Sequence, residues 1–341
     1  MRTPDFSNLL AVLNRQRPSR PTLFEFFLNR RLYAHLAGTP ESADMGQWGS
    51  AQWSLIVAKA YERAGYDYVT MYASDLGFPS RPVAAGKSHS MNDTAVITDR
   101  PSFESYAWAD PDRTDFSRLD TVAATLHPGM KIIAFGPGGV LENAIALVGY
   151  EPLCLLLLDD EPLAAEIFAA IGSRLLRYYQ RAVTHPAVGA IISNDDWGFH
   201  TQLMLPPDML RKYVFPWHRQ IAAAAHAVGK PAILHSCGQL GDVMDEVIDD
   251  LRFDGKHSYE DKITPVETAY ERWGKRIAIL GGLDLDFVCR KSPAEIRARA
   301  QAMLDRSRDL GSYALGTGNS VPDYVPDENY FAMIEPAVGR I

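Results

Sequence analysis

The sequence predicts an α/β protein that forms a single (β/α)8 TIM barrel over residues 1–341, with an N-terminal extension. Two observations predict this fold. Strand-like apolar runs alternate with polar or glycine-rich breaks and helical stretches. The 341 residues also suit one barrel with insertions, and no linker or low-complexity segment divides them. The eight expected strands are residues 22–27, 67–72, 131–135, 188–193, 231–235, 253–257, 276–280 and 312–315.

Signals at helix ends support this alternation. One helix is expected over residues 206–228, between a Pro-Pro-Asp start and a Gly-Lys end. Another is expected over residues 292–310, where Ser292 caps the first turn and Glu295 occupies its third position. Residues 77–120 are rich in Pro, Ser, Asp and aromatic side chains, so we expect an elaborated loop after the second strand that forms a lid or a substrate wall.

A doubly wound open sheet is the main alternative to the barrel. Such a sheet would carry a glycine-rich phosphate-binding turn after its first strand. Residues 28–31, which follow the first expected strand, read Leu-Asn-Arg-Arg. The barrel is therefore favoured.

Composition narrows the class of protein. The chain is 47% hydrophobic and 22% charged, with a formal net charge of −8 and no basic stripe, so we expect neither a nucleic-acid nor a membrane partner. The apolar run 153–158 is too short to span a bilayer, and the N-terminus lacks a signal-peptide pattern. Three widely spaced cysteines disfavour a disulfide framework and indicate a reducing compartment. We expect a cytoplasmic enzyme.

Chemically reactive side chains gather where the strands end. In a (β/α)8 barrel the carboxyl ends of the strands form the active-site face. A barrel with only a structural role would not need acids, thiols and imidazoles at so many of these ends. The side chains are Glu25, Asp75, Asp195, Asp196, His235, Cys237, His257, Glu260, Asp284 and Asn319.

His235 and Cys237 form the sharpest signal. Side chains two residues apart on a strand point the same way, so the imidazole and the thiolate can share one metal ion. This donor pair suits zinc, and an open catalytic zinc site needs three protein ligands. The competing interpretation is a buried cysteine beside a hydrogen-bonded histidine. Cys154 and Cys289 lie in apolar or helical surroundings that indicate core packing.

Three carboxylates are candidate catalytic groups near this pair. Asp195 and Asp196 follow a strand directly, and neighbouring carboxylates raise each other's pKa when they are desolvated. Because neighbours on a strand point to opposite faces, one of the two lines the pocket while the other is free to cap the following loop. Glu25 lies inside an apolar run, so it is either functional or paired with an arginine inside the barrel.

The loop after the fourth strand carries candidate substrate-binding residues. Trp197 and His200, together with a nearby Phe and Met, suit an aromatic or macrocyclic ligand, although helix packing explains them equally well. Glu260 and Asn319, at two later strand ends, complete the set of predicted substrate-binding residues.

Taken together, these motifs resemble the uroporphyrinogen decarboxylase superfamily, which includes zinc-dependent methyltransferases that act on methyl-corrinoid proteins. The resemblance implies the same barrel and extends over most of the chain. It is carried by residues 135–138, 148–151, 194–198, 234–238, 280–284, 316–323 and 326–329.

The methyltransferase branch is the better match. Its members place a His-x-Cys motif after the fifth strand, as His235 and Cys237 do here, and a third zinc ligand, a cysteine, in the closing motif. Asn319 stands at that third position, so the coordination would be completed by its oxygen, by Glu25, by Glu260 or by an aspartate. The true decarboxylases use an aspartate after the second strand, which Asp75 resembles, but their N-terminal arginine motif is not reproduced.

The leading hypothesis is therefore metal-assisted methyl transfer or demethylation of a small substrate. The expected cofactors are zinc and a corrinoid carried by a partner protein, since the chain has no Asp-x-His-x-x-Gly motif of its own. The first alternative is a uroporphyrinogen decarboxylase or a related decarboxylase that uses Asp75 without metal. The second is a non-catalytic ligand-binding barrel. The resemblance also implies a homodimer.

Overall fold

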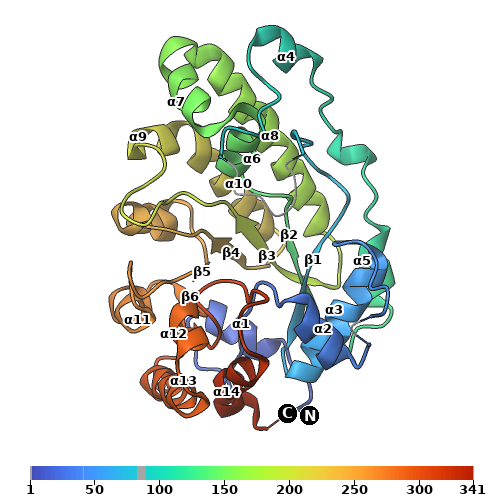
Figure 1. The fold of residues 1–341 in the computed structure, drawn as a ribbon, viewed down its shortest axis with the longest axis vertical. Helices are drawn as coiled ribbons and strands as arrows, with labels where there is room; N and C mark the ends of the chain where they lie inside the picture. Colours follow the sequence, from blue (N-terminus) through green and yellow to red (C-terminus); the bar gives the residue numbers. More distant parts are fainter. Residues whose placement is uncertain (1, 41, 83–89, 341) are drawn as a thin grey trace.

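The computed structural model describes residues 2–40, 42–82 and 90–340 (Figure 1). A curled parallel sheet lies at the centre, and its strands follow one another in the order of the sequence. Strands β2 and β3 are almost entirely buried, as expected for parallel strands covered on both faces. The strands are β1 (Tyr68–Tyr72), β2 (Lys131–Phe135), β3 (Val188–Asn194), β4 (Ala232–His235), β5 (Gly255–His257), β6 (Ala278–Leu280) and β7 (Tyr313–Ala314).

The α/β fold is confirmed, but a complete eight-stranded barrel is not, because the first expected strand does not form. Residues 22–27 make a single parallel bridge beside β7, between Leu23 and Leu315. Among the described residues, no backbone hydrogen bond joins this segment to β1 on its other side. The sheet therefore has seven strands and stays open between β1 and residues 22–27.

Side chains replace the missing backbone ladder. The Tyr68 hydroxyl donates to the Glu25 carbonyl at 2.9 Å, and the Thr70 hydroxyl donates to the Phe26 carbonyl at 2.7 Å. The Tyr61 hydroxyl also donates to the Phe26 carbonyl, at 3.1 Å. Because these side chains stand between the two backbones, the segment is held too far from β1 for the strand spacing of about 4.8 Å.

Helices connect the strands and pack around the sheet (Figure 1). The N-terminal extension and the first connection supply three helices, and the last helix packs against α13. The helices are α1 (Ser7–Leu13), α2 (Arg30–Ala37), α3 (Ala51–Ala64), α4 (Arg100–Ser105), α5 (Ser117–Ala123), α6 (Val140–Val148), α7 (Tyr150–Asp159), α8 (Glu161–Ala182), α9 (Pro207–Met209), α10 (Phe215–His226), α11 (Val266–Trp273), α12 (Leu285–Arg290), α13 (Pro293–Ser307) and α14 (Asp327–Val338).

The helix predictions agree with the structure. The expected helix over 206–228 is a continuous helical run from α9 through a π-helical turn (Leu210–Val214) into α10. The helix α13 begins with the expected capping box, in which Ser292 and Glu295 bind each other's backbone N–H groups. The elaborated stretch 77–120 contains α4 and the start of α5, and its residues 83–89 lie outside the described part of the chain.

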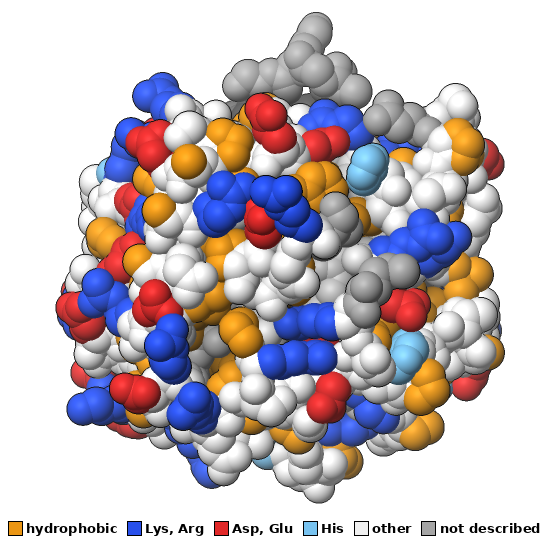
Figure 2. All heavy atoms as spheres, turned by 90° about the horizontal axis from the view of Figure 1, so that it is seen from below, with side chains coloured by type: hydrophobic (Ala, Val, Ile, Leu, Met, Phe, Trp, Pro, Cys, Tyr) orange, Lys and Arg blue, Asp and Glu red, His pale blue; other side chains and the backbone are white. Residues whose placement is uncertain are grey.

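The surface carries charges of both signs. Figure 2 shows the molecule from below the view of Figure 1, and on this face Lys and Arg side chains are interspersed with Asp and Glu. Within the described ranges, no single helix is long and apolar enough to cross a bilayer. The bent pair of α6 and α7 meets the length and composition criteria together, with an angle of 95° between the two helices.

Candidate metal centre

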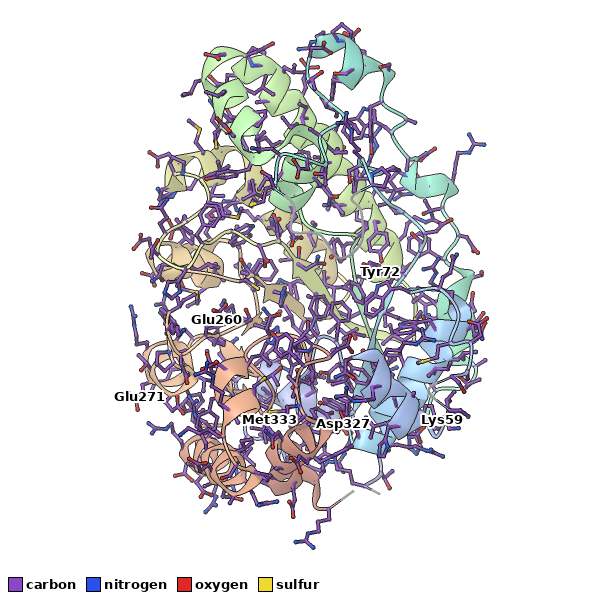
Figure 3. All side chains as sticks on the ribbon, viewed as in Figure 1. Lys59, Tyr72, Glu260, Glu271, Asp327 and Met333 are labelled. Atoms are coloured by element: carbon purple, nitrogen blue, oxygen red, sulfur yellow. The ribbon has the colours of Figure 1, made fainter. Side chains whose placement is uncertain are left out.

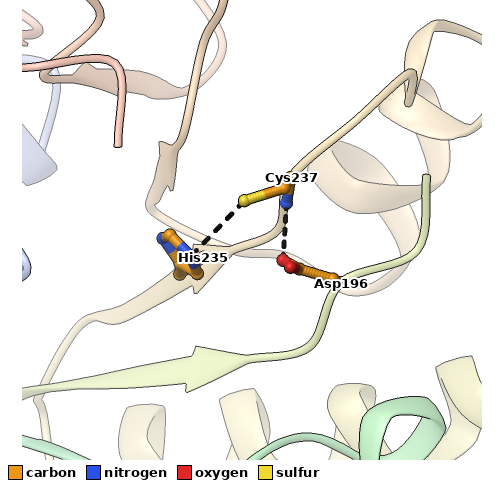
Figure 4. Close-up of side chains that lie close together, drawn as sticks. All are labelled: Asp196, His235 and Cys237. Carbon is orange, nitrogen blue, oxygen red and sulfur yellow. Dashed lines mark hydrogen bonds between the residues drawn. The ribbon is translucent and has the colours of Figure 1, made fainter. Parts of the chain in front are cut away.

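Three donor side chains meet at the carboxyl ends of β3 and β4 (Figure 4). His235 is the last residue of β4, Cys237 follows two residues later, and Asp196 follows β3. One donor atom from each residue lies within 4.8 Å of the others. We call Asp196, His235 and Cys237 the metal cluster. It confirms that the His-x-Cys pair converges, and it brings in one of the two neighbouring aspartates.

The geometry of the cluster suits a small tetrahedral ion. His235 Nε2 lies 3.8 Å from Cys237 Sγ, close to the roughly 3.5 Å that separates nitrogen and sulfur ligands around tetrahedral zinc. The backbone N–H of Cys237 donates to Asp196 Oδ1 at 2.8 Å, which holds the carboxylate beside the thiol. Thiolate, imidazole and carboxylate together form a donor set that zinc accepts.

A hydrogen-bonded chain orients the imidazole of His235. His235 Nδ1 lies 2.8 Å from His257 Nδ1, and His257 Nε2 lies 3.4 Å from the carbonyl oxygen of Thr317. A carbonyl only accepts, so His257 carries its proton on Nε2 and accepts from His235 through Nδ1. His235 then keeps its proton on Nδ1 and presents the lone pair of Nε2 to the cluster, the form that binds metal.

Burial keeps the thiol of Cys237 and the imidazole of His235 neutral without metal. It raises the pKa of Cys237 to about 12, with a further increase from Asp196, and it lowers the pKa of His235 to about 4. Asn319 Nδ2 donates to Cys237 Sγ at 3.2 Å, and the Ser258 hydroxyl donates to it at 3.4 Å. Asn319 therefore turns its amide N–H toward the sulfur, and Asp196 stands as the third donor instead.

Glu25 has a hydroxyl and a backbone amide as partners, not an arginine. The Thr317 N–H lies 2.7 Å from Glu25 Oε1, and the Thr317 hydroxyl lies 2.7 Å from Oε2. That hydroxyl also contacts the carbonyl of Asn319, to which it donates. Burial raises the pKa of Glu25 to about 8, so Glu25 is protonated at neutral pH and donates to the Thr317 oxygen. A catalytic role for Glu25 stays a prediction.

Asp195 turns away from the cluster and caps α6. Its carboxylate accepts backbone N–H groups of residues 140–142 at 2.9–3.0 Å and His218 Nε2 at 2.9 Å. The helix dipole favours an anion at this end. A Cβ on Gly139 would lie 2.1 Å from Asp195, so the helix approaches this closely only because residue 139 is glycine. All these contacts are structural, and a catalytic role for Asp195 stays a prediction.

Sequence reasoning missed two titratable residues near the cluster, Glu142 and Lys256. Glu142 lies beside the two aspartates, and burial together with their charges raises its pKa to about 8. Lys256, in β5, is buried, and burial lowers its pKa to about 8 although Cys237 and Asp196 act in the opposite direction. A lysine inside a buried strand was a signal that could have found Lys256. Glu142 gave no such signal, because in the sequence it resembles an ordinary capping-box residue.

The other predicted residues are dispersed. Trp197 is fully buried against Phe215 and His218, and His200 is exposed. Glu260 lines a cavity of about 20 Å³ with Lys256, and Figure 3 shows it in the loop after β5. Asp75 is exposed in a separate cleft after β1. Of the predicted substrate-binding residues, Asn319 alone touches the metal cluster within the described chain.

The chain belongs to the uroporphyrinogen decarboxylase (URO-D) family, because the family model matches residues 58–338. Its fold resembles that of a methyltransferase from Methanosarcina mazei, with a TM-score of 0.68 at 17% identity over 98% of both chains. At this identity the likeness concerns the fold.

Two xylanases are more distant in structure. The Penicillium canescens enzyme XylE has a TM-score of 0.45 at 8% identity, over 93% of this chain and 98% of that one. Xylanase B from Clostridium stercorarium has a TM-score of 0.39 at 13% identity, over 72% and 88%. Neither bears on function. No curated protein sequence matches the chain significantly.

Proposed function

We propose that this URO-D family protein is a metal-dependent, methyltransferase-like enzyme that moves a methyl group to or from a small substrate. The metal cluster carries the proposal, since Asp196, His235 and Cys237 offer three donor atoms within 4.8 Å. The chain of hydrogen bonds through His257 adds support because it prepares His235 Nε2 for a metal. The fold of the Methanosarcina mazei methyltransferase is consistent with this function.

The chain's own residues bind the metal and manage charge and protons. A bound zinc ion would act as a Lewis acid that lowers the pKa of a substrate thiol or hydroxyl. The ammonium group of Lys256 lies near Asp196 and Cys237 and would offset the negative charge that the thiolate carries once a metal is bound. Glu142, with its pKa raised to about 8 by burial and by the two aspartates, holds a proton beside Asp196 near neutral pH. In this proposal Glu142 exchanges that proton with a substrate.

The methyl partner in this proposal is a corrinoid carried by a separate protein. In the demethylating direction, a Co(I) corrinoid would be the nucleophile that accepts the methyl group, the bond from methyl to the substrate heteroatom would break, and the substrate would leave as an anion stabilised by the metal that Asp196, His235 and Cys237 would hold. Free cob(I)alamin serves as the probe, since methylation changes its absorbance. Methylcobalamin formation that depends on Cys237 is expected, and formation unchanged in Cys237→Ala would overturn the methyl-transfer assignment.

Metal content tests the cluster directly. Elemental analysis of the untagged protein is expected to give about one zinc per chain, and His235→Ala or Cys237→Ala to lose nearly all of it. Cys154→Ala and Cys289→Ala are matched controls, because both cysteines are free and partly buried outside the cluster. Zinc retained in the cluster variants, or absent from the wild type after zinc reconstitution, would refute the site.

The same variants separate the two competing hypotheses. A decarboxylase that uses Asp75 would release carbon dioxide in a reaction that Asp75→Asn abolishes and Cys237→Ala does not. Asp75 lies in a cleft at the active-site end of the sheet, which is the observation in its favour. A binding barrel without catalysis would retain ligand but show neither activity.

A further inference from the structure

A polar cleft opens at the same end of the sheet as the metal cluster. It is a cleft of about 430 Å³ at the carboxyl ends of β1 and β2, and Figure 3 shows Tyr72 where β1 ends. We call it the β1–β2 cleft. It is lined by Gln47, Trp48, Gly49, Ser50, Tyr72, Ser74, Asp75, Leu76, Arg118 and Pro137.

The cleft contains one carboxylate and one guanidinium group, and neither is neutralised by an ion pair. Asp75 Oδ1 accepts the backbone N–H of Asp115 at 3.0 Å. Arg118 Nη1 donates to the carbonyl of Gly49 at 2.6 Å. In the described ranges neither residue has an oppositely charged side chain within 4.0 Å. One carboxylate oxygen and the rest of the guanidinium fork are therefore available to a ligand.

A row of ring contacts runs from the rim of the cleft into the protein interior toward His235, and we call its two accessible members, Trp48 and Phe27, the aromatic wall. Trp48 lies on the rim with half of its surface exposed, at 51%, which is unusual for so large an apolar side chain. Its ring lies 5.2 Å from that of Phe27, which lies 3.9 Å from Phe26, whose ring in turn lies 4.7 Å from His235. Because Phe26 is buried, the wall offered to an apolar ligand tail consists of Trp48 and the half-buried Phe27.

We propose that the β1–β2 cleft binds the head group of a small zwitterion of the α-amino-acid type. The carboxylate pairs with Arg118, which suits bidentate recognition, and the ammonium group pairs with Asp75. The methyl-bearing tail packs along the aromatic wall. This assignment of the tail rests on the proposed function, whereas the head site stands on the cleft alone.

Three probes with the same methylthio tail test the head group. L-Methionine carries both charges, 4-(methylthio)butanoate lacks the ammonium group, and 3-(methylthio)propylamine lacks the carboxylate. Calorimetric titration of the full-length protein is expected to show methionine binding at least tenfold tighter than either single-charge probe. Arg118→Gln should weaken methionine at least tenfold while hardly changing the amine, and Asp75→Asn should weaken methionine while hardly changing the butanoate.

Two further variants keep the test interpretable. Arg118→Lys retains the positive charge and a donor for Gly49, so partial binding there excludes collapse of the loop as the cause of loss. Arg177→Gln, which changes an exposed arginine paired with Asp112 outside the cleft, should leave binding unchanged. Equal binding of the three probes, no binding of any, or binding indifferent to Arg118 and Asp75 would each overturn the proposal.

The Cys237→Ala protein separates this proposal from the proposed function. Methionine binding that persists in this variant supports the head site even where methyl transfer fails. Binding lost in Cys237→Ala as completely as in Arg118→Gln would overturn an independent head site in the cleft.

Discussion

The metal cluster and the β1–β2 cleft lie at the same end of one sheet, yet they treat charge in opposite ways. In the cluster, the buried His235 and the partly buried Cys237 are neutral and hydrogen-bonded within the protein. In the cleft, Asp75 is exposed and Arg118 makes no ion pair among the residues described. The metal cluster is therefore preorganised for an ion, while the β1–β2 cleft leaves charged groups free to bind a ligand.

The neighbours Asp195 and Asp196 give the sharpest test of which carboxylate belongs to the cluster. Asp195→Ala is expected to lower the free energy of unfolding by about 3–5 kcal/mol, because it leaves three helix N–H groups and His218 without their buried acceptor. Asp196→Ala should cost at most about 1 kcal/mol, since it loses one hydrogen bond, but it should release the metal. Urea denaturation and elemental analysis measure both.

A reversed pattern would exchange the two roles. If Asp195→Ala lost metal at unchanged stability, Asp195 and not Asp196 would supply the carboxylate of the metal cluster. Asp195→Asn supplies a milder version, because the amide oxygen still accepts N–H groups.

This pair also shows how far the sequence could predict the site. Alternation along a strand predicted that one aspartate would line the pocket and the other would cap a loop, but not which, because that depends on where α6 begins 55 residues earlier. His235 and Cys237 were predictable because their spacing is local. Lys256, Glu142 and the charges of the cleft depend on contacts between distant segments.

The fold was predictable to a similar depth. Seven of the eight expected strands formed, because apolar runs that are buried on both faces leave a clear pattern. Residues 22–27 carry the same pattern. These residues do not pair with β1 because the large side chains of Tyr68 and Tyr61 stand in between. Their hydroxyl groups bind the backbone carbonyls that β1 would have bound. A hydropathy pattern contains no information about that competition.

The buried carboxyl group of Glu25 predicts that the stability of the protein depends on pH. Its pKa is raised to about 8 by burial, against an ordinary value of 4.5 in the unfolded chain, so between these values the folded state holds a proton that the unfolded state lacks. The contribution of Glu25 to the free energy of unfolding is therefore fully present below about pH 4.5. It falls by about 1.4 kcal/mol per pH unit between about pH 4.5 and pH 8, and it is constant above that.

Glu25→Gln removes that titration while imitating the protonated acid. From pH 5.5 to 7.5 the variant should gain about 3 kcal/mol relative to the wild type, measured by urea denaturation at each pH. A constant difference between the two proteins would mean that Glu25 is ionised throughout. The conservative Asp5→Asn, at an exposed carboxylate, serves as the control.

His257 tests whether the cluster is preorganised through its surroundings. His257→Phe removes the acceptor for His235 Nδ1–H and should weaken zinc binding about 10–100-fold, measured by competition with a chelator. Cobalt(II) substitution should also show an altered visible spectrum, which a purely structural role would not produce. His226→Phe, which breaks a contact with Asp254 remote from the cluster, should leave both measurements unchanged.

The smallest expected effect concerns the shape of the cleft. Gly49 has a φ of +77°, and a Cβ there would lie 2.9 Å from the ring of Tyr72, so Gly49→Ala forces the loop away from β1. We expect a loss of about 1 kcal/mol in stability and weaker methionine binding, with unchanged zinc content. Gly77→Ala is the matched control, because its Cβ would meet nothing within 4 Å. If Gly49→Ala lost zinc together with methionine binding, the cleft and the cluster would form one site. A shift confined to the loop at Gly49 would not disturb three ligands that lie at the ends of β3 and β4 if the two sites were independent.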